Sequence, residues 1–186
     1  MIDEPSVKVL LFSDLFGAFL DDRGSFDRCA DAYRTLAEAG MEIIFISGAL
    51  QEIAREALST LLPQPALIAA GGKAVFAPES SPLAAAAREG ASPQRNPDQL
   101  SAAEWAAGVY RGDGDIVLSF GVGDAKDDTF LKTVDVAALI PGPEGEICPL
   151  IPRPEVVYCC NNPGQEGWNE WADLMLKKIV VINFRI

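Results

Sequence analysis

The sequence predicts a single α/β domain in which a mainly parallel sheet lies between two layers of helices. The chain has 186 residues, 49% of them hydrophobic, which is enough to bury one full core. Short apolar runs, typical of strands buried on both faces, alternate with segments of helical periodicity. Because crossovers between parallel strands are right-handed, this alternation favours a three-layer α/β/α sandwich over residues 1–186.

The first half of the chain supplies three strands and two helices. Strands are predicted at 7–12, 42–46 and 66–70, where apolar and β-branched residues run together. Apolar residues recur at helical spacing over 26–37 and over 50–61. Each of these two segments is followed by a glycine or a proline, which end helices, so both are predicted to be helical.

The second half of the chain continues the same alternation of apolar runs and helical periodicity. The expected elements are a helix at 102–110, a strand at 115–120, a turn at 121–124, a short helix at 129–134, a strand at 136–140 and a helix at 166–178.

Three segments lack this alternation. Residues 78–99 are rich in Ala, Pro and Ser and are predicted to form a linker with one short helix. Residues 141–163 are rich in proline and are expected to be irregular. The apolar tail at 179–186 favours an extra edge strand or a dimer contact, so we expect a homodimer.

The composition excludes several classes of function. A net charge of −12 and a pI near 4.4 repel nucleic acids and anionic membranes, so neither partner is expected. An acidic N-terminus without an apolar leader predicts a cytoplasmic protein. The four cysteines form no CxxC pair, and the absence of histidine excludes Ser-His and Cys-His mechanisms. Carboxylates, hydroxyls, lysines or a metal ion must therefore carry any chemistry.

Acidic and hydroxyl residues follow three of the predicted strands. In open α/β sheets, ligands bind outside the carboxyl ends of the strands. Several carboxylates in one place raise one another's pKa unless a cation neutralises them, and magnesium needs only one or two carboxylates. The sequence therefore predicts an Mg²⁺ site among the residues at these strand ends, which are Asp14, Ser47, Gly48, Asp124, Asp127 and Asp128.

Five segments resemble the haloacid dehalogenase superfamily, in the right order along the chain. Residues 12–21 resemble its first motif, D-x-D-G-T-L, and 46–48 resemble the second. Residues 123–128 are similar to the fourth motif, G-D-x-x-N-D. Residues 70–76 and 164–170 resemble the E-N-G-G-A-V-F and G-P-E-G-W-N-E stretches of mannosyl-3-phosphoglycerate phosphatases.

The resemblance implies a Rossmann-like core and a phosphatase acting on a small phosphorylated molecule, and a site without a cap also favours a large substrate such as a phosphoprotein. Asp14 takes the position of the nucleophile, which forms an aspartyl-phosphate. Ser47 and Gly48 match the residues that hold the phosphoryl group. The Mg²⁺ ligands would be the carboxylates of Asp14, Asp124 and Asp128 and the backbone carbonyl of Phe16.

The chain also departs from the family pattern. Phe16 replaces the second aspartate, which protonates the leaving group in the family's phosphatases. No lysine of the third motif appears in 101–110, although Lys73 or Lys126 could substitute for it in space. The segment 78–99 is too short for the family's cap domain. Three more family residues are missing, at Ala18, Ala49 and Gly71.

These departures leave three functional hypotheses open: a weak phosphohydrolase, a catalytically inactive binding or scaffold protein, and a dehalogenase, whose family members carry an aromatic residue at the position of Phe16. Structural roles also compete with the functional ones. Asp14 could cap a turn, Ser47 could cap a helix, and Asp127 and Asp128 could favour a helix N-terminus. Trp168 and Trp171 are expected to pack in the core rather than to bind a ligand.

Overall fold

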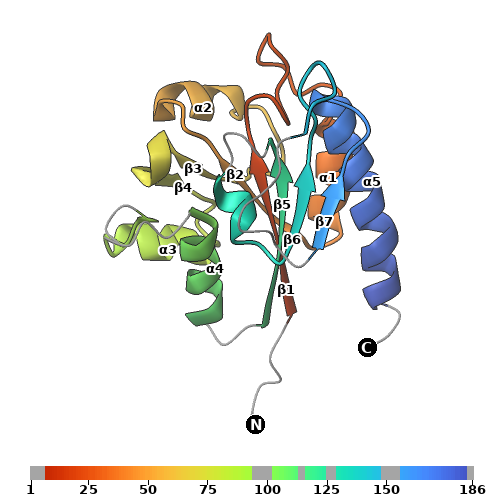
Figure 1. The fold of residues 1–186 in the computed structure, drawn as a ribbon. Helices are drawn as coiled ribbons and strands as arrows, with labels where there is room; N and C mark the ends of the chain where they lie inside the picture. The colour runs from red at the N-terminus through yellow and green to blue at the C-terminus, as the bar shows by residue number, and fades with distance from the viewer. Residues whose placement is uncertain (1–6, 94–101, 113–115, 125–128, 148–155, 184–186) are drawn as a thin grey trace.

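The computed structural model describes residues 7–93, 102–112, 116–124, 129–147 and 156–183, and all of its strands belong to one sheet (Figure 1). The strand order is β4-β3-β2-β1-β5-β6-β7, and only β4 runs antiparallel to its neighbour. The strands are β1 (Val7–Asp14), β2 (Glu42–Ile46), β3 (Ala66–Ala69), β4 (Ala74–Phe76), β5 (Ile116–Gly123), β6 (Val136–Leu139) and β7 (Val156–Cys159).

Helices cover both faces of this sheet. In Figure 1, α1 and α5 lie on one side of it, and α3 and α4 lie on the other. The bounds are α1 (Ala30–Glu38), α2 (Gln51–Ala57), α3 (Pro82–Arg88), α4 (Ala102–Gly112) and α5 (Gly164–Asn183), with short 3-10 helices η1 (Ala70–Gly72) and η3 (Thr129–Lys132).

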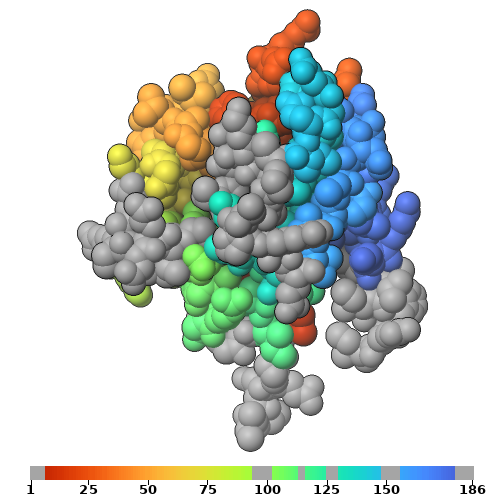
Figure 2. Space-filling view, viewed as in Figure 1, coloured from red at the N-terminus to blue at the C-terminus, as the bar shows by residue number. Residues whose placement is uncertain are grey.

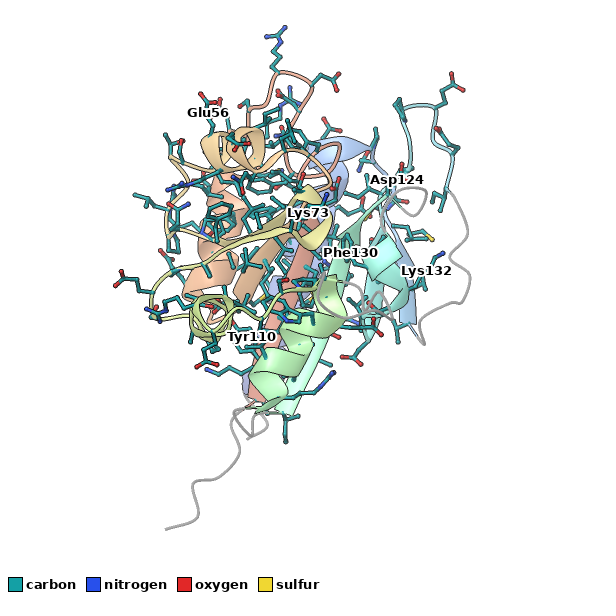
Figure 3. All side chains as sticks on the ribbon, turned by 90° about the vertical axis from the view of Figure 1, so that its left-hand side faces the viewer. Glu56, Lys73, Tyr110, Asp124, Phe130 and Lys132 are labelled. Atoms are coloured by element: carbon teal, nitrogen blue, oxygen red, sulfur yellow. The ribbon has the colours of Figure 1, made fainter. Side chains whose placement is uncertain are left out.

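The central strand β1 separates two hydrophobic cores. Leu10 and Leu11 are fully buried on opposite faces, as alternation along a strand requires. Leu11 belongs to the core beneath α1 and α5, together with Phe19 and Trp168. Leu10 belongs to the core beneath α3 and α4, together with Tyr110 and Phe130, which are labelled in Figure 3. The three-layer α/β/α sandwich predicted from the sequence is therefore confirmed.

Strand β5 is longer than predicted. Residues 121–123, expected to form a turn, continue the strand and pair with β6, with Gly121 opposite Ala137. A Cβ atom at Gly121 would lie 2.8 Å from the Cδ2 atom of Leu131, so the glycine allows close packing of η3 rather than a change of chain direction.

Two edge strands were not predicted. Before β4 the chain turns at Gly71 and Gly72, whose φ angles of 62° and 88° favour glycine. β7 lies within the segment 141–163 that was expected to be irregular, and it pairs with β6. Both strands are short, so their apolar pattern is weak in the sequence.

The predicted linker at 78–99 contains α3, in agreement with the one short helix expected there. The Oγ atom of Ser81 accepts a hydrogen bond from the backbone N–H of Leu83 and caps this helix. Residues 94–99 lie outside the described part of the chain, so the prediction of a vestigial cap stays untested.

The expected edge strand at 179–186 is wrong as far as the structure describes that segment, because α5 continues to Asn183. Extending a helix that already exists needs no new nucleation, so β-branched residues at its end can be helical. The homodimer prediction relied on the apolar character of this tail, not on its being a strand, and stays untested. Among the described residues no helix, α5 included, is both long and apolar enough to cross a membrane.

Candidate functional site

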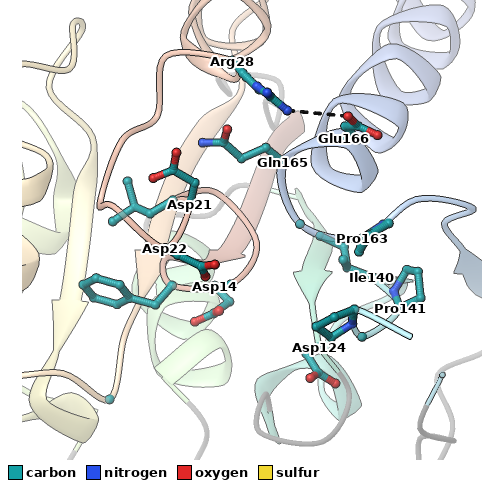
Figure 4. A pocket seen from close by; sticks show the side chains of 17 residues that line it. Asp14, Asp21, Asp22, Arg28, Asp124, Ile140, Pro141, Pro163, Gln165 and Glu166 are labelled. Atoms are coloured by element: carbon teal, nitrogen blue, oxygen red, sulfur yellow. Dashed lines mark ion pairs between the residues drawn. The ribbon is translucent and has the colours of Figure 1, made fainter. Parts of the chain in front are cut away.

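A pocket of about 810 Å³ lies at the carboxyl end of the parallel strands (Figure 4). This volume is within the usual range for small-molecule sites. Asp14 lines the pocket at the end of β1, Asp124 directly after β5, and Gly48 after β2. The position agrees with the rule that open α/β sheets bind ligands outside the carboxyl ends of their strands.

Loops form the walls of this pocket. The loop after β1 contributes Phe16, Gly17 and residues 20–22, the segment after β6 contributes 140–143, and the start of α5 contributes 163–166. The space-filling view shows the loop after β1 and the segment after β6 projecting at the same end of the molecule, at the top of Figure 2.

The topology explains why Asp14 and Asp124 meet. β1 and β5 are neighbouring parallel strands, and their pairing ends with Ser13 opposite Val122. The two aspartates therefore leave the sheet almost level with each other, and both are half-buried. The structure thus places in one pocket two of the acidic residues that the sequence singled out.

Ser47 and Gly48 differ in their access to the pocket. Gly48 lines it and is exposed, whereas Ser47 is buried and is not among the lining residues. The Oγ atom of Ser47 accepts a hydrogen bond from the N–H of Ala49 at 3.1 Å, which leaves its hydroxyl proton available to donate. The N-cap of α2 is Leu50, so the structure corrects the helix-cap alternative for Ser47.

Phe16 lines the pocket from the loop that follows β1, with 38% of its surface exposed. A hydrogen bond from the N–H of Leu20 to the carbonyl of Leu15, at 2.8 Å, closes this loop. The phenyl ring thus stands in the pocket where the family pattern has a carboxylate. It can supply contact area but no proton.

Other predicted residues are not brought into the described pocket. Lys73 is exposed and does not line it. Lys126, Asp127 and Asp128 lie outside the described residues, so their predicted roles are not tested.

The pocket is strongly acidic. Its carboxylates are Asp14, Asp21, Asp22, Asp124 and Glu166, whereas Arg28 is the one cation among the described lining residues. The Nη1 atom of Arg28 lies 3.6 Å from the Oε1 atom of Glu166, and both side chains are mostly exposed. A phosphate group would therefore enter a negative field unless a cation were bound with it.

The donor set fits a magnesium ion. Two half-buried carboxylates that line one open pocket supply the hard oxygen ligands this ion prefers, and water and substrate oxygens complete its octahedron. Within the described ranges no three acidic or cysteine side chains are grouped closely enough to form a complete protein cage. Magnesium does not require such a cage, because it keeps several of its waters.

The sequence did not single out Arg28, Asp22, Gln165 or the 140–143 segment as site residues. These residues lie in loops, far from one another in the chain, and no local pattern shows that they converge. The resemblance at 164–170 was the one signal that could have directed attention to Gln165 and Glu166.

The structure has the Rossmann-like α/β fold that the sequence predicted, a mainly parallel sheet between two layers of helices. No family model and no curated protein matches the sequence. The structure is similar to a crystal structure from Eubacterium rectale provisionally assigned as a phosphatase, with a TM-score of 0.57 and 14% identity, over 89% of this chain and 98% of that one.

Two further solved structures give lower scores. A protein from Legionella pneumophila, provisionally assigned as a hydrolase of HAD subfamily III A, gives a TM-score of 0.49 at 14% identity, over 94% of this chain and 88% of its own. A hypothetical protein from Xanthomonas campestris gives 0.47 at 16% identity, over 97% and 90%. At such identities the likeness shows the fold alone, and the finer resemblance to mannosyl-3-phosphoglycerate phosphatases stays a prediction.

Proposed function

We propose that this protein is a magnesium-dependent phosphohydrolase of the haloacid dehalogenase type, with Asp14 as its nucleophile. The observation that carries the proposal is the shared pocket of Asp14 and Asp124 at the carboxyl end of β1 and β5. The provisional phosphatase assignment of the Eubacterium rectale protein supports the same class of reaction.

In the proposed reaction the Asp14 carboxylate attacks the phosphorus atom of a phosphomonoester. An oxygen–phosphorus bond forms at Asp14 while the ester bond breaks, and the leaving alkoxide takes a proton from water. A second water then attacks the aspartyl-phosphate, which releases phosphate and restores the carboxylate. The exposed backbone at Gly48, with the hydroxyl of Ser47 beside it, would hold the phosphoryl oxygens.

The ligands proposed for the metal are Asp14, Asp124, Asp128 and the backbone carbonyl of Phe16. When bound there, Mg²⁺ supplies positive charge that offsets the repulsion between the phosphoryl group and the carboxylates. The acidic lining of the pocket supports the need for a bound cation. Arg28, the one cation among the described lining residues, forms an ion pair with Glu166 and therefore offsets little of the negative charge near Asp14.

Turnover is expected to be slow. Phe16 cannot protonate the leaving group or activate the second water, and a general acid–base residue typically contributes about 10²–10⁴-fold. The open pocket suits either a small phosphorylated molecule or a phosphoprotein. The free thiols of Cys29, Cys159 and Cys160 support a reducing compartment such as the cytoplasm.

The deciding experiment measures phosphate release from p-nitrophenyl phosphate with Mg²⁺. Asp14→Asn should abolish the release, and Asp124→Asn should raise the Mg²⁺ concentration needed for half-maximal rate. Asp22→Asn is the matched control, because Asp22 lines the same pocket but belongs to no proposed step. Release that persists unchanged in Asp14→Asn would disprove the proposal.

A catalytically inactive binding or scaffold protein is the second candidate. The exposed phenyl ring of Phe16 favours it, because this ring presents apolar surface at the pocket and has no role in phosphoryl transfer. Such a protein would bind Mg²⁺ and a phosphate analogue such as beryllium trifluoride without any release of phosphate that depends on Asp14.

A further inference from the structure

The segment GQEGWNE at residues 164–170 forms the first turns of α5 and contacts the site at several points. We propose that this segment positions the nucleophile, chiefly through a hydrogen-bond chain from Trp168 through Ser13 to Asp14. The inference rests on the proposed function of Asp14 and adds a role for residues far from it in sequence. Trp168 is then a positioning residue and touches no substrate.

The chain consists of two hydrogen bonds, of which the first is buried and the second is partly buried. The Nε1–H of Trp168 donates to the Oγ atom of Ser13 at 2.9 Å, and the Oγ–H of Ser13 donates to the backbone carbonyl of Asp14 at 2.9 Å. Both Trp168 and Ser13 have no exposed surface. Because water does not reach Trp168 or Ser13, their hydrogen bond is strong, and through Ser13 it helps to fix the peptide group that follows Asp14, where the chain leaves β1.

Gln165 holds the other end of the same loop. Its Nε2 amide donates to the carbonyl of Phe19 at 2.8 Å and to the carbonyl of Ser25 at 2.7 Å. Only 7% of Gln165 is exposed, although it lines the pocket. The loop that carries Phe16 is therefore tied to α5 on both sides, at Asp14 before it and at Phe19 after it.

The GQEGWNE segment is itself firmly anchored. The carboxylate of Glu170 accepts hydrogen bonds from the hydroxyl of Tyr158 at 2.6 Å, from the backbone N–H of Asn161 at 2.9 Å and from the side chain of Asn162 at 3.2 Å. A Cβ atom at Gly167 would lie 2.2 Å from the carbonyl oxygen of Asn162, so the turn packs directly on this helix. Because the GQEGWNE segment is anchored in this way, it can hold Asp14 and the loop after β1 in a defined position.

Through these contacts, α5 determines the position of the nucleophile Asp14. The carboxylate of Asp14 extends from the end of a strand whose last peptide group is fixed by Trp168 through Ser13. Asp124 follows β5 directly and is not part of this hydrogen-bond chain. Loss of the indole N–H should therefore let Asp14 shift relative to Asp124 while the fold is kept.

The chain provides a matched control for Trp168 in Trp171. Both indoles are buried on α5, but the Nε1 atom of Trp171 has no hydrogen-bond partner among the described residues. Replacement by Phe thus removes the same atoms at both positions, and only one of them belongs to the chain that reaches Asp14. A decrease in kcat that both variants share would therefore reflect the lost packing of the indole and not the lost hydrogen bond.

The kinetic test compares Trp168→Phe, Ser13→Ala and Trp171→Phe in Mg²⁺-dependent release of phosphate from p-nitrophenyl phosphate. Displacement of a reacting group by about 1 Å costs about 10²-fold, so kcat should fall by about 10- to 100-fold in the first two variants, with KM nearly unchanged. The double variant should be no slower than Ser13→Ala alone, because both changes break one chain. Equal kcat in Trp168→Phe and Trp171→Phe would overturn the inference.

A second measurement does not depend on turnover. In ¹H–¹⁵N spectra, Ser13→Ala should shift the indole N–H signal of Trp168 and speed its hydrogen exchange, and it should leave the signal of Trp171 in place. An unchanged Trp168 signal would overturn the hydrogen-bond chain. If the chain is present but the wild type releases no phosphate that depends on Asp14, the proposed function fails instead.

Discussion

Phe16 is the residue whose chemistry differs most from what its position suggests. It lines the acidic pocket next to Asp14, and its ring is partly exposed. The position therefore has room for a different side chain without any change in the core. This allows the missing acid–base group to be restored.

Phe16→Asp should increase phosphate release by about 10²–10⁴-fold at saturating Mg²⁺, because a carboxyl group there can protonate the leaving group and activate water. Phe16→Asn is the control, since it has nearly the same shape but cannot transfer the proton. Steady-state assays with p-nitrophenyl phosphate measure the effect. An equal gain in both variants would mean that removal of the ring, and not acid–base chemistry, raises the rate.

Glu170 is the carboxylate that links β7 to α5. Burial alone raises its pKa, but the hydrogen bonds from Tyr158, Asn161 and Asn162 outweigh that effect and leave the pKa below its ordinary value. The same hydrogen bond raises the pKa of Tyr158 to about 12, so the phenol remains a donor. Because folding lowers the pKa of Glu170, this group stabilises the fold above its unfolded-state pKa, and the contribution is lost as the pH falls through the folded-state value.

Glu170→Gln should therefore lower the free energy of unfolding near neutral pH and make it less sensitive to acid. Urea unfolding at about pH 7 and about pH 4 measures both effects, and the difference between the two conditions should shrink in the variant. Glu166→Gln is the control, because its exposed ion pair with Arg28 contributes little. An undiminished loss of stability in acid would assign that loss to other carboxylates.

At the scale of an element, the start of α5 depends on a glycine. Gly167 lies within the helix, where glycine is usually unfavourable, but the carbonyl of Asn162 occupies the space that a Cβ atom would need. Gly108, within α4, has open space at the same place. One substitution should thus have opposite effects in the two helices.

Gly167→Ala should destabilise the protein by about 1–3 kcal/mol, because a methyl group there forces the backbone apart. Gly108→Ala should stabilise it by up to about 1 kcal/mol, because alanine favours the helix. Chemical denaturation of the two variants measures both values. A loss of stability in Gly108→Ala would show that its helix face packs more closely than the structure indicates.

At the scale of the whole molecule, the net charge of −12 makes cation binding and folding interdependent. Mutual repulsion of acidic groups destabilises a compact state. A cation held by Asp14 and Asp124 would reduce that repulsion at one point, and salt would screen it everywhere. The two effects can be separated by substitution.

Mg²⁺ should raise the melting temperature more than NaCl of equal ionic strength, and EDTA should remove the difference. A ligand at about 100 times its Kd stabilises a protein by about 2.7 kcal/mol. Asp14→Asn and Asp124→Asn should lose the response to Mg²⁺ and keep the response to NaCl. Differential scanning calorimetry provides the measurement, and an equal Mg²⁺ response in the variants would place the ion elsewhere.

The outline of the fold could be predicted because it depends on local patterns. The apolar run of β1 and the helical period of α4 are properties of a few consecutive residues, so Asp14 could be placed at a strand end. The edge strands β4 and β7 are too short to give such a pattern. The end of α5 was misassigned because β-branched residues favour strands only weakly once a helix has formed.

The amino-acid sequence by itself determined a parallel α/β sheet, acidic residues at its strand ends, and a phenylalanine where the family pattern has an aspartate. The tertiary structure decided which loops meet over these residues, because the approach of Arg28, Pro141 and Gln165 depends on how the elements pack. It also decided that Trp168 reaches Ser13 across the core. Hydrophobic periodicity is local and can be read along the chain, whereas a contact between distant residues exists only once the whole core has formed.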